Sequence, residues 1–290
     1  MRDPISMSSR DALFRGTVRI VISSRIAKGV HDQLAVPEVA TGFIVESRDG
    51  DHSEQFIVTA AHVVSGADDG SMFFIRISAN PEDGALFEFR RRSRFGEMWY
   101  YARDPKLDIA ITPLSRDSEV TNAFLKADVL VLVWALWDSQ VPDDEPEWAS
   151  WTQFNDFEEV LFAGYPAGYW DPLSGSPIVR RGVTATPLLA DYEGDPVFLI
   201  DAAIYPGCSG GPVVVIEPEP VPSVSPDEPS THRIAVGRRE RIMFLGMITD
   251  VQHERGNPAS LLNLGRVVKA AKIFEAIRQY RELVPWDGSD

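Results

Sequence analysis

The sequence predicts an all-β protein with two β units. Short apolar runs separated by turn residues recur along most of the chain, as in β-barrels and sandwiches. Two series of such runs lie on either side of residues 138–159, which contain eight acidic residues and no Lys or Arg. With 290 residues, of which 44% are hydrophobic, the chain is long enough to bury a core in one or two domains.

The strands of each unit are expected where the apolar runs are richest in β-branched and aromatic residues. In the first unit these runs are residues 17–22, 41–45, 56–59 and 72–77. In the second unit they are residues 160–163, 183–186, 197–200, 213–216 and 242–245. Turn residues, such as those at 48–50 and 68–70, separate the runs.

Helical spacing of apolar residues is clear only near the C-terminus. It predicts a helix over about residues 266–282 that packs on the second unit. Residues 119–137 fit a buried strand or a helix equally well and are interpreted as a connection. Five prolines between residues 217 and 232 predict a long exposed loop.

Charge and composition exclude several classes of function. A formal net charge of −15 disfavours nucleic acid as a partner. The arginines of residues 90–94 are interpreted as a solvated strand face rather than a phosphate site. The longest apolar run, residues 129–137, is too short for a membrane-spanning helix. The N-terminus lacks a secretory apolar segment and Cys208 has no internal partner, so we expect a cytoplasmic protein.

The strongest chemical signal is the motif Pro-Gly-Cys-Ser-Gly-Gly-Pro at residues 206–212, which lies between two predicted strands. Glycines on both sides of Ser209 allow a tight turn whose backbone N–H groups converge, as an oxyanion hole requires. A structural glycine turn with an idle serine is the alternative. A serine nucleophile also needs a general base and a group that orients that base.

His62 and Asp108 are the candidates for these two roles. Among the five histidines, only His62 ends an apolar strand in a compact run of small residues, at 57–64. Asp108 interrupts an apolar strand at residues 107–111, where a carboxylate is costly to bury unless it is paired. An aspartate paired with His62 would fix the imidazole tautomer and stabilise the imidazolium.

These motifs resemble those of the trypsin-like (chymotrypsin-fold) serine proteases, in particular the bacterial type without zymogen activation and the HtrA-like domains. The matching segments follow the family's order of histidine, aspartate and serine, and they are Thr-Ala-Ala-His at 59–62, Asp-Ile-Ala at 108–110 and Gly-Cys-Ser-Gly-Gly-Pro at 207–212. Residues 41–45, 163–168 and 246–249 add support, and the resemblance covers about residues 12–283.

The resemblance implies a fold of two six-stranded antiparallel β-barrels with a C-terminal α-helix. The expected units are an N-terminal barrel at 12–118, a connection with the acidic insertion at 119–158, a C-terminal barrel at 159–265 and a helix at 266–283. The resemblance also implies a nucleophilic Ser209, a general base His62, an orienting Asp108 and an oxyanion hole formed by the N–H groups of Gly207 and Ser209. No metal or cofactor is expected.

Two other nucleophile assignments fit the residues less well. Cys208 occupies the place where digestive members carry an aspartate, but a thiol nucleophile requires a glycine directly after it, and Ser209 stands there. We therefore interpret Cys208 as a small buried packing residue. The Gly-x-Ser-x-Gly elbow of α/β-hydrolases requires a helix after the serine, and a valine-rich strand follows Ser209 instead.

The expected substrate is a peptide or protein. We expect no membrane partner, and we expect a regulatory protein as a further partner. The resemblance places Ala203 at the base of the primary specificity pocket, with Gly246, Met247 and Ile248 as further lining residues. Without a carboxylate at the base, we expect a preference for a small or medium apolar side chain. The alternative function is a catalytically silent peptide-binding or scaffold protein on the same fold.

Overall fold

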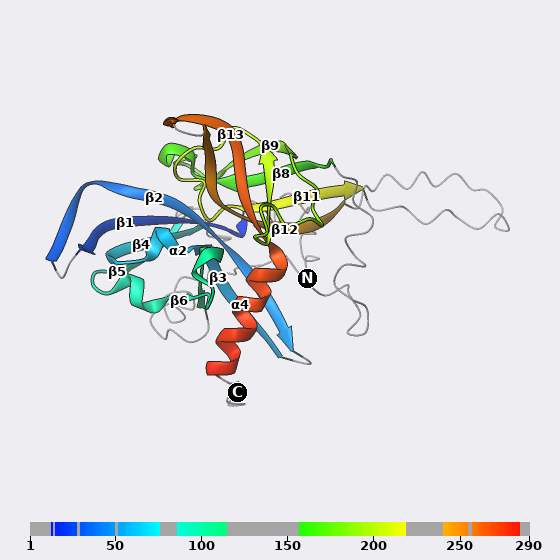
Figure 1. The fold of residues 1–290 in the computed structure, drawn as a ribbon. Helices are drawn as coiled ribbons and strands as arrows, with labels where there is room; N and C mark the ends of the chain where they lie inside the picture. Colours follow the sequence, from blue (N-terminus) through cyan, green and yellow to red (C-terminus); the bar gives the residue numbers. More distant parts are fainter. Residues whose placement is uncertain are drawn as a thin grey trace, which may run out of the picture.

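A computed structural model describes Leu13 and residues 15–27, 30–49, 52–75, 86–114, 157–218, 240–254 and 257–284. The connection at 119–137, most of the acidic stretch at 138–159 and most of the proline-rich segment at 217–232 lie outside these residues. The described chain forms two β units, as the two series of apolar runs predict (Figure 1).

The first unit is a curled antiparallel sheet of seven strands. Its strands are β1 (Thr17–Ala27), β2 (Val30–Asp49), β3 (His52–Ala60), β4 (Ala67–Ile75), β5 (Leu86–Arg91), β6 (Tyr100–Tyr101) and β7 (Ile109–Pro113). Their spatial order is β5-β4-β1-β2-β3-β7-β6. The additional strand relative to the six expected is the two-residue β6, which pairs with β7.

The second unit is a closed antiparallel barrel of six strands, as expected. Its strands are β8 (Glu159–Gly164), β9 (Ile178–Thr184), β10 (Val197–Asp201), β11 (Pro212–Pro218), β12 (Glu240–Glu254) and β13 (Asn257–Lys269). Closure removes exposed strand edges and encloses a core of aliphatic and aromatic side chains. The chymotrypsin-like double-barrel fold class is therefore confirmed.

Helix α4 (Ala270–Leu283) begins four residues later than the periodicity indicated. Val267 and Val268 instead end β13, where they pair with Phe198 and Val197. Both valines are fully buried, and they face two different cores. Adjacent side chains of a strand point to opposite faces, so a strand can bury both valines in this way.

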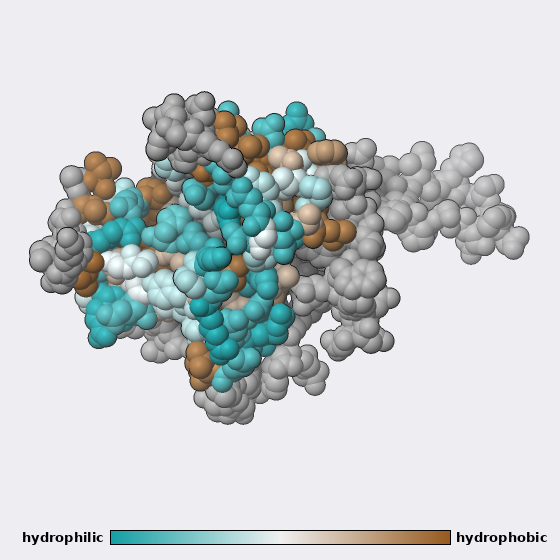
Figure 2. Space-filling model, in the orientation of Figure 1, coloured by the Kyte–Doolittle hydropathy of each residue, from teal (hydrophilic) through white to brown (hydrophobic). Residues whose placement is uncertain are grey.

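Helix α4 packs against both units and not only the second one. Its Phe274 ring makes an edge contact with Phe244 of β12, and its Tyr280 ring contacts Phe56 of β3. In Figure 1 the helix lies beside β3, and Figure 2 shows that this face of the molecule is largely hydrophilic over the helix. The apolar face of α4 thus joins the two units, while its polar face meets water.

One hydrophobic core extends from the first sheet into the second barrel. It includes Phe43 of β2, Met247 of β12 and Ile273 of α4, each fully buried, and the Phe43 and Phe244 rings meet edge to face at 5.3 Å. Close-packed interiors hold their elements in a fixed arrangement. The residues that the two units present to each other are therefore rigidly placed.

Within the described residues, no helix is both long enough and apolar enough to cross a lipid bilayer.

Candidate active site

His62 is held at the point where β3 ends. The strand stops at Ala60, and the single-turn helix α2 (Ala61–Val64) carries His62. Strand pairing places Ala60 opposite Ile109, so the start of α2 lies next to the residue that precedes β7. That residue is Asp108.

Asp108 contacts the His62 segment through its backbone and through both carboxylate oxygens. Its carbonyl accepts the Ala61 N–H at 2.9 Å, and its Oδ1 accepts the His62 N–H at 2.8 Å. Its Oδ2 lies 2.7 Å from His62 Nδ1. Asp108 has a left-handed backbone (φ 53°) after the short helix η3 (Pro105–Leu107), and this unusual conformation aims the carboxylate at the ring.

The pairing determines which ring nitrogen is free. A carboxylate only accepts hydrogen bonds, so Nδ1 carries the proton and Nε2 has the lone pair when the ring is neutral. The hydrogen bond to Asp108 raises the pKa of His62, with a further contribution from the negative charge of Asp250, whereas burial and Arg25 oppose the rise. The His62 side chain is 54% exposed, so the ring remains accessible to a substrate.

Ser209 lies in a turn that is held by several backbone hydrogen bonds. The Cys208 N–H donates to the Tyr205 carbonyl at 3.0 Å, with Pro206 and Gly207 as the central residues. Proline at the first central position and a positive φ (+97°) at Gly207 identify a type II turn. A Cβ at residue 207 would collide with the Tyr165 carbonyl oxygen, so glycine is required.

The turn leaves two N–H groups free next to the serine. The Pro206 carbonyl accepts the Ala167 N–H at 2.6 Å, and a trans peptide points its own N–H, that of Gly207, the opposite way. Among the described residues, neither the Gly207 N–H nor the Ser209 N–H donates a hydrogen bond to a backbone carbonyl. Free donors of this kind can stabilise a developing oxyanion.

The segment that holds Pro206 is itself anchored to the first unit. It comprises Tyr165, the short helix η5 (Pro166–Gly168) and Trp170. The Arg19 guanidinium of β1 lies over the Trp170 ring at 4.5 Å, and burial lowers the pKa of Arg19. Tyr165 is buried, and its hydroxyl donates a hydrogen bond to the Thr17 carbonyl at 3.5 Å.

The loop around Ser209 meets the strand that leads to His62. The Ser209 carbonyl accepts the Thr41 N–H at 3.0 Å, and the Thr41 carbonyl accepts the Thr59 hydroxyl at 2.7 Å. A Cβ at Gly210 would collide with Thr59 Oγ1 and with the Thr41 carbonyl oxygen. Ser209 is partly exposed, and among the described residues no hydrogen bond joins its hydroxyl to His62.

Cys208 is buried and packs in the core of the second barrel. Burial raises the pKa of its thiol, which disfavours the reactive thiolate. This placement matches the packing role that the sequence predicts.

The four residues of the expected specificity pocket lie in different environments. Ala203 is partly exposed, whereas Gly246, Met247 and Ile248 are buried. Met247 and Ile248 have no exposed surface and pack in the two cores, so their side chains are not available to an open pocket. Gly246 lies beside a bulge of β12 against β11, and a Cβ at this position would collide with the Val268 carbonyl oxygen.

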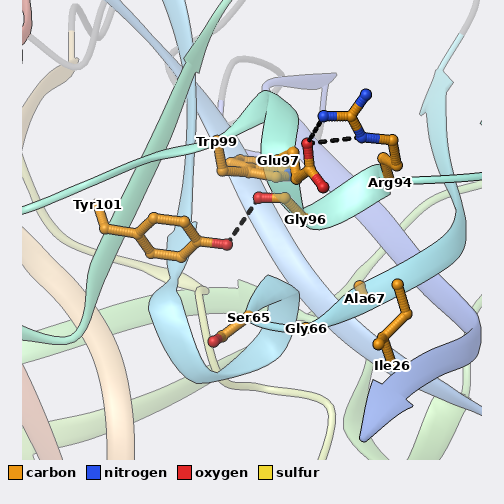
Figure 3. Close-up of a pocket in the computed structure, with 9 residues that line it drawn as sticks. All are labelled: Ile26, Ser65, Gly66, Ala67, Arg94, Gly96, Glu97, Trp99 and Tyr101. Atoms are coloured by element: carbon orange, nitrogen blue, oxygen red, sulfur yellow. Dashed lines mark hydrogen bonds and ion pairs between the residues drawn. The ribbon is translucent and has the colours of Figure 1, made fainter. Parts of the chain in front are cut away.

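A pocket of about 440 Å³ lies beside α2, away from His62, Asp108 and Ser209 (Figure 3). It is lined by Ile26, Ser65, Gly66, Ala67, Arg94, Gly96, Glu97, Trp99 and Tyr101. Arg94 and Glu97 are ion-paired at its wall, and the Tyr101 hydroxyl donates to the Gly96 carbonyl. In the described part of the chain, no group of three or more metal-binding side chains occurs.

Three of the four arginines at residues 90–94 bind nearby acceptors. Arg90 binds Asp69 through two nitrogens, Arg91 donates to the Ser93 carbonyl, and Arg94 pairs with Glu97. Arg90, Arg92 and Arg94 are exposed, as the sequence indicates, but only Arg90 and Arg91 lie on β5, whereas Arg92 and Arg94 follow the strand.

Comparison with known families identifies the family of this chain. A family model described as a trypsin-like peptidase domain matches residues 40–219, which is more than half of the chain. The chain belongs to the trypsin-like peptidase family. Among curated proteins, no sequence matches it.

Solved structures similar to this peptidase include three proteases. An HtrA-type protease, AlgW, with a decapeptide aligns over 98% of this chain and 71% of its own, at 16% identity and a TM-score of 0.50. A thermostable serine protease, AL20, from an extremophilic microorganism aligns over 93% and 98%, at 13% identity and a TM-score of 0.45. The MamO protease domain from Magnetospirillum magneticum (apo form) aligns over 92% and 97%, at 15% identity and a TM-score of 0.44. At these identities the likeness concerns the fold.

Three residues that contact or act on the candidate site were missed from the sequence. Thr41 and Ala167 lie in the segments that supported the resemblance, but neither received a role. Asp250, which is exposed and acts electrostatically on His62, was not singled out either. None of the three stands out by local pattern, because each acts through a partner that is distant in the chain.

Proposed function

We propose that this protein is a serine endopeptidase that cleaves peptide bonds through an acyl-enzyme. The observation that carries the proposal is the 2.7 Å contact between Asp108 Oδ2 and His62 Nδ1, because it leaves Nε2 as the proton acceptor. The free N–H groups of Gly207 and Ser209 supply the second requirement, which is stabilisation of negative charge.

In the proposed reaction, the Ser209 hydroxyl oxygen attacks the substrate carbonyl carbon, and His62 Nε2 takes its proton. The carbonyl oxygen becomes an oxyanion and receives hydrogen bonds from the N–H groups of Gly207 and Ser209. The tetrahedral intermediate collapses, the C–N bond breaks, and the leaving amine takes the proton from His62. Asp108 stabilises the transient imidazolium.

Water then completes the cycle. His62 Nε2 removes a proton from a water molecule, whose oxygen attacks the ester carbon of the acyl-enzyme. The second tetrahedral intermediate releases the carboxylic acid, and Ser209 recovers its proton from His62. The named groups and water supply every proton and electron pair that moves in these steps, so no cofactor is required.

The proposed substrate preference rests on Ala203 and not on the acidic stretch. Ala203 offers no carboxylate to a basic side chain, which favours a small or medium apolar residue on the acyl side of the scissile bond. The acidic stretch at 138–159 is proposed to keep the protein in solution rather than to steer substrates, because salt screens charges beyond about 8 Å.

A fluorophosphonate probe tests the proposal directly. It should label the wild-type protein on Ser209, while the Ser209→Ala variant should remain unlabelled and should lose hydrolysis of a fluorogenic peptide library. A folded wild-type protein that neither reacts with the probe nor cleaves peptides would instead be the peptide-binding or scaffold protein. In that case, peptide binding without turnover should be measurable by calorimetry.

A further inference from the structure

Thr41 connects the first unit to the loop that carries Ser209. It lies on β2 and has no exposed surface. Its hydroxyl donates to the Gly207 carbonyl at 2.6 Å and accepts the Tyr165 N–H at 3.1 Å. One side chain of the first unit therefore binds both the turn before Ser209 and the segment that supports this turn.

The backbone of Thr41 holds the same loop from the other side of Ser209. Its N–H donates to the Ser209 carbonyl at 3.0 Å, and its carbonyl accepts the Thr59 hydroxyl at 2.7 Å. The glycine that follows the serine approaches so closely that a Cβ would collide with the Thr41 carbonyl oxygen. Thr41 thus contacts the loop before and after the proposed nucleophile.

The successive peptide groups of the loop can be assigned in full. The Pro206 carbonyl binds Ala167, the Gly207 carbonyl binds the Thr41 hydroxyl, and the Cys208 carbonyl accepts the Gly211 N–H. The Ser209 carbonyl binds the Thr41 N–H, and the Gly210 N–H donates to the Ile248 carbonyl. Two of the four carbonyls are therefore oriented by Thr41.

This arrangement bears on the N–H groups of Gly207 and Ser209, which have no partner within the described part of the chain. A peptide group is planar, so each held carbonyl also fixes the direction of the N–H in its plane. The two donors belong to the peptides on either side of the Gly207–Cys208 peptide, whose carbonyl Thr41 holds. The carbonyls of the two donor peptides bind Ala167 and Gly211, and Thr41 holds the peptide that joins them. A rotation of this peptide changes the ψ of Gly207 and the φ of Cys208, which set the angle between the two donors.

We propose that Thr41 is a positioning residue for the oxyanion hole, with its hydroxyl holding the Gly207–Cys208 peptide in the orientation that catalysis requires. The inference rests on the proposed peptidase function. The Thr41 hydroxyl is expected to affect the transition state, because the oxyanion hole binds a charge that the bound substrate does not carry. Loss of the hydroxyl should accordingly reduce kcat more than it changes KM.

The test compares Thr41→Val, which keeps the shape and removes the hydroxyl, with Thr41→Ser, which keeps the hydroxyl. A matched control is Thr184→Val, because Thr184 is also fully buried and its hydroxyl accepts the Glu158 N–H at 2.8 Å, outside the Ser209 loop. The readouts are kcat and KM on a peptide substrate, the inhibition constant of a peptide aldehyde, and the melting temperature.

Thr41→Val should lower kcat by roughly 10- to 10³-fold, where the upper limit is the effect of removing one oxyanion donor. KM should change less than about threefold. The aldehyde, which forms a tetrahedral adduct, should bind more weakly by a similar factor. Thr41→Ser should recover most of both losses. Thr184→Val should melt at a lower temperature but keep kcat.

Wild-type kcat and aldehyde affinity in folded Thr41→Val, or equal losses in Thr41→Val and Thr184→Val, would overturn the inference while leaving the peptidase proposal intact. A wild-type protein without turnover or probe labelling would overturn both. If Thr41→Val does not fold, Thr41→Ser and Thr41→Ala differ by the hydroxyl alone. Equal kcat in that pair also rejects the positioning role.

Discussion

Asp108 binds His62 twice, through Oδ1 to the backbone N–H at 2.8 Å and through Oδ2 to Nδ1 at 2.7 Å. The first bond fixes the backbone of His62, and the second bond orients its imidazole ring. Because both bonds come from one carboxylate, the ring cannot turn without breaking a contact of the aspartate. This double contact makes Asp108 the residue on which the proton acceptor depends.

Replacing Asp108 by Asn should lower kcat by about 10⁴-fold, because the amide NH₂ can donate to Nδ1 and so favour the wrong imidazole tautomer. Steady-state kinetics on a fluorogenic peptide measures the effect. The matched control is Asp201→Asn, an exposed aspartate at the end of β10, which should keep full activity. Similar kcat values for the two variants would remove Asp108 from the mechanism.

The activity should depend on pH through His62. The pKa of His62 is raised above its ordinary value of 6.5, and only the neutral ring can accept the Ser209 proton. The kcat/KM should therefore be low in acid and rise through a midpoint above pH 6.5. Asp250→Asn removes a negative charge that stabilises the imidazolium, so this midpoint should move to lower pH.

The control for this shift is Asp201→Asn, whose charge does not contribute to the His62 pKa. Its profile should coincide with that of the wild type. A midpoint that moves upward in Asp250→Asn, or that moves equally in both variants, would contradict the electrostatic role of Asp250.

Gly207→Ala should abolish activity and destabilise the protein by about 4 kcal/mol or more, since a Cβ collides with the Tyr165 carbonyl oxygen. Gly194→Ala provides the comparison, because Gly194 also has a positive φ (+81°) but open space around its Cβ position. That change should cost only about 1–2 kcal/mol, the price of the left-handed backbone. Urea unfolding measures both, and equal losses would refute the close approach.

Cys208→Ala should retain kcat within a few-fold, because the buried thiol with its raised pKa serves packing and not nucleophilic attack. A modest loss of stability, about 1 kcal/mol, should follow from the lost sulfur contacts. Activity and urea unfolding are measured together. A folded variant without activity would make the thiol, and not Ser209, the candidate nucleophile.

Cleavage of a peptide library should show a preference for small or medium apolar residues on the acyl side of the scissile bond. Ala203→Asp places a carboxylate at the expected base of the pocket and should shift the preference towards Arg and Lys. Mass-spectrometric identification of the products gives both profiles. Dominance of basic residues in the wild-type profile would show that Ala203 does not form the base of the pocket.

Much of the fold and of the candidate site follows from local sequence. Alternating apolar runs predict the strands, because side chains on a strand face opposite sides. The glycines around Ser209 predict the tight turn, and the lone Asp108 in an apolar run predicts a paired carboxylate, which the structure pairs with His62. Each of these signals lies within a few residues of its cause.

The tertiary structure decided what depends on partners far apart in the chain. The apolar spacing extended the predicted helix over Val267 and Val268, although both belong to β13. Local periodicity carries no information about their pairing with residues 197 and 198. Met247 and Ile248 have no accessible side chain because two cores meet at β12. The role inferred for Thr41 arises from a hydrogen bond to Gly207 across 166 residues, a contact that only the docking of the two units creates.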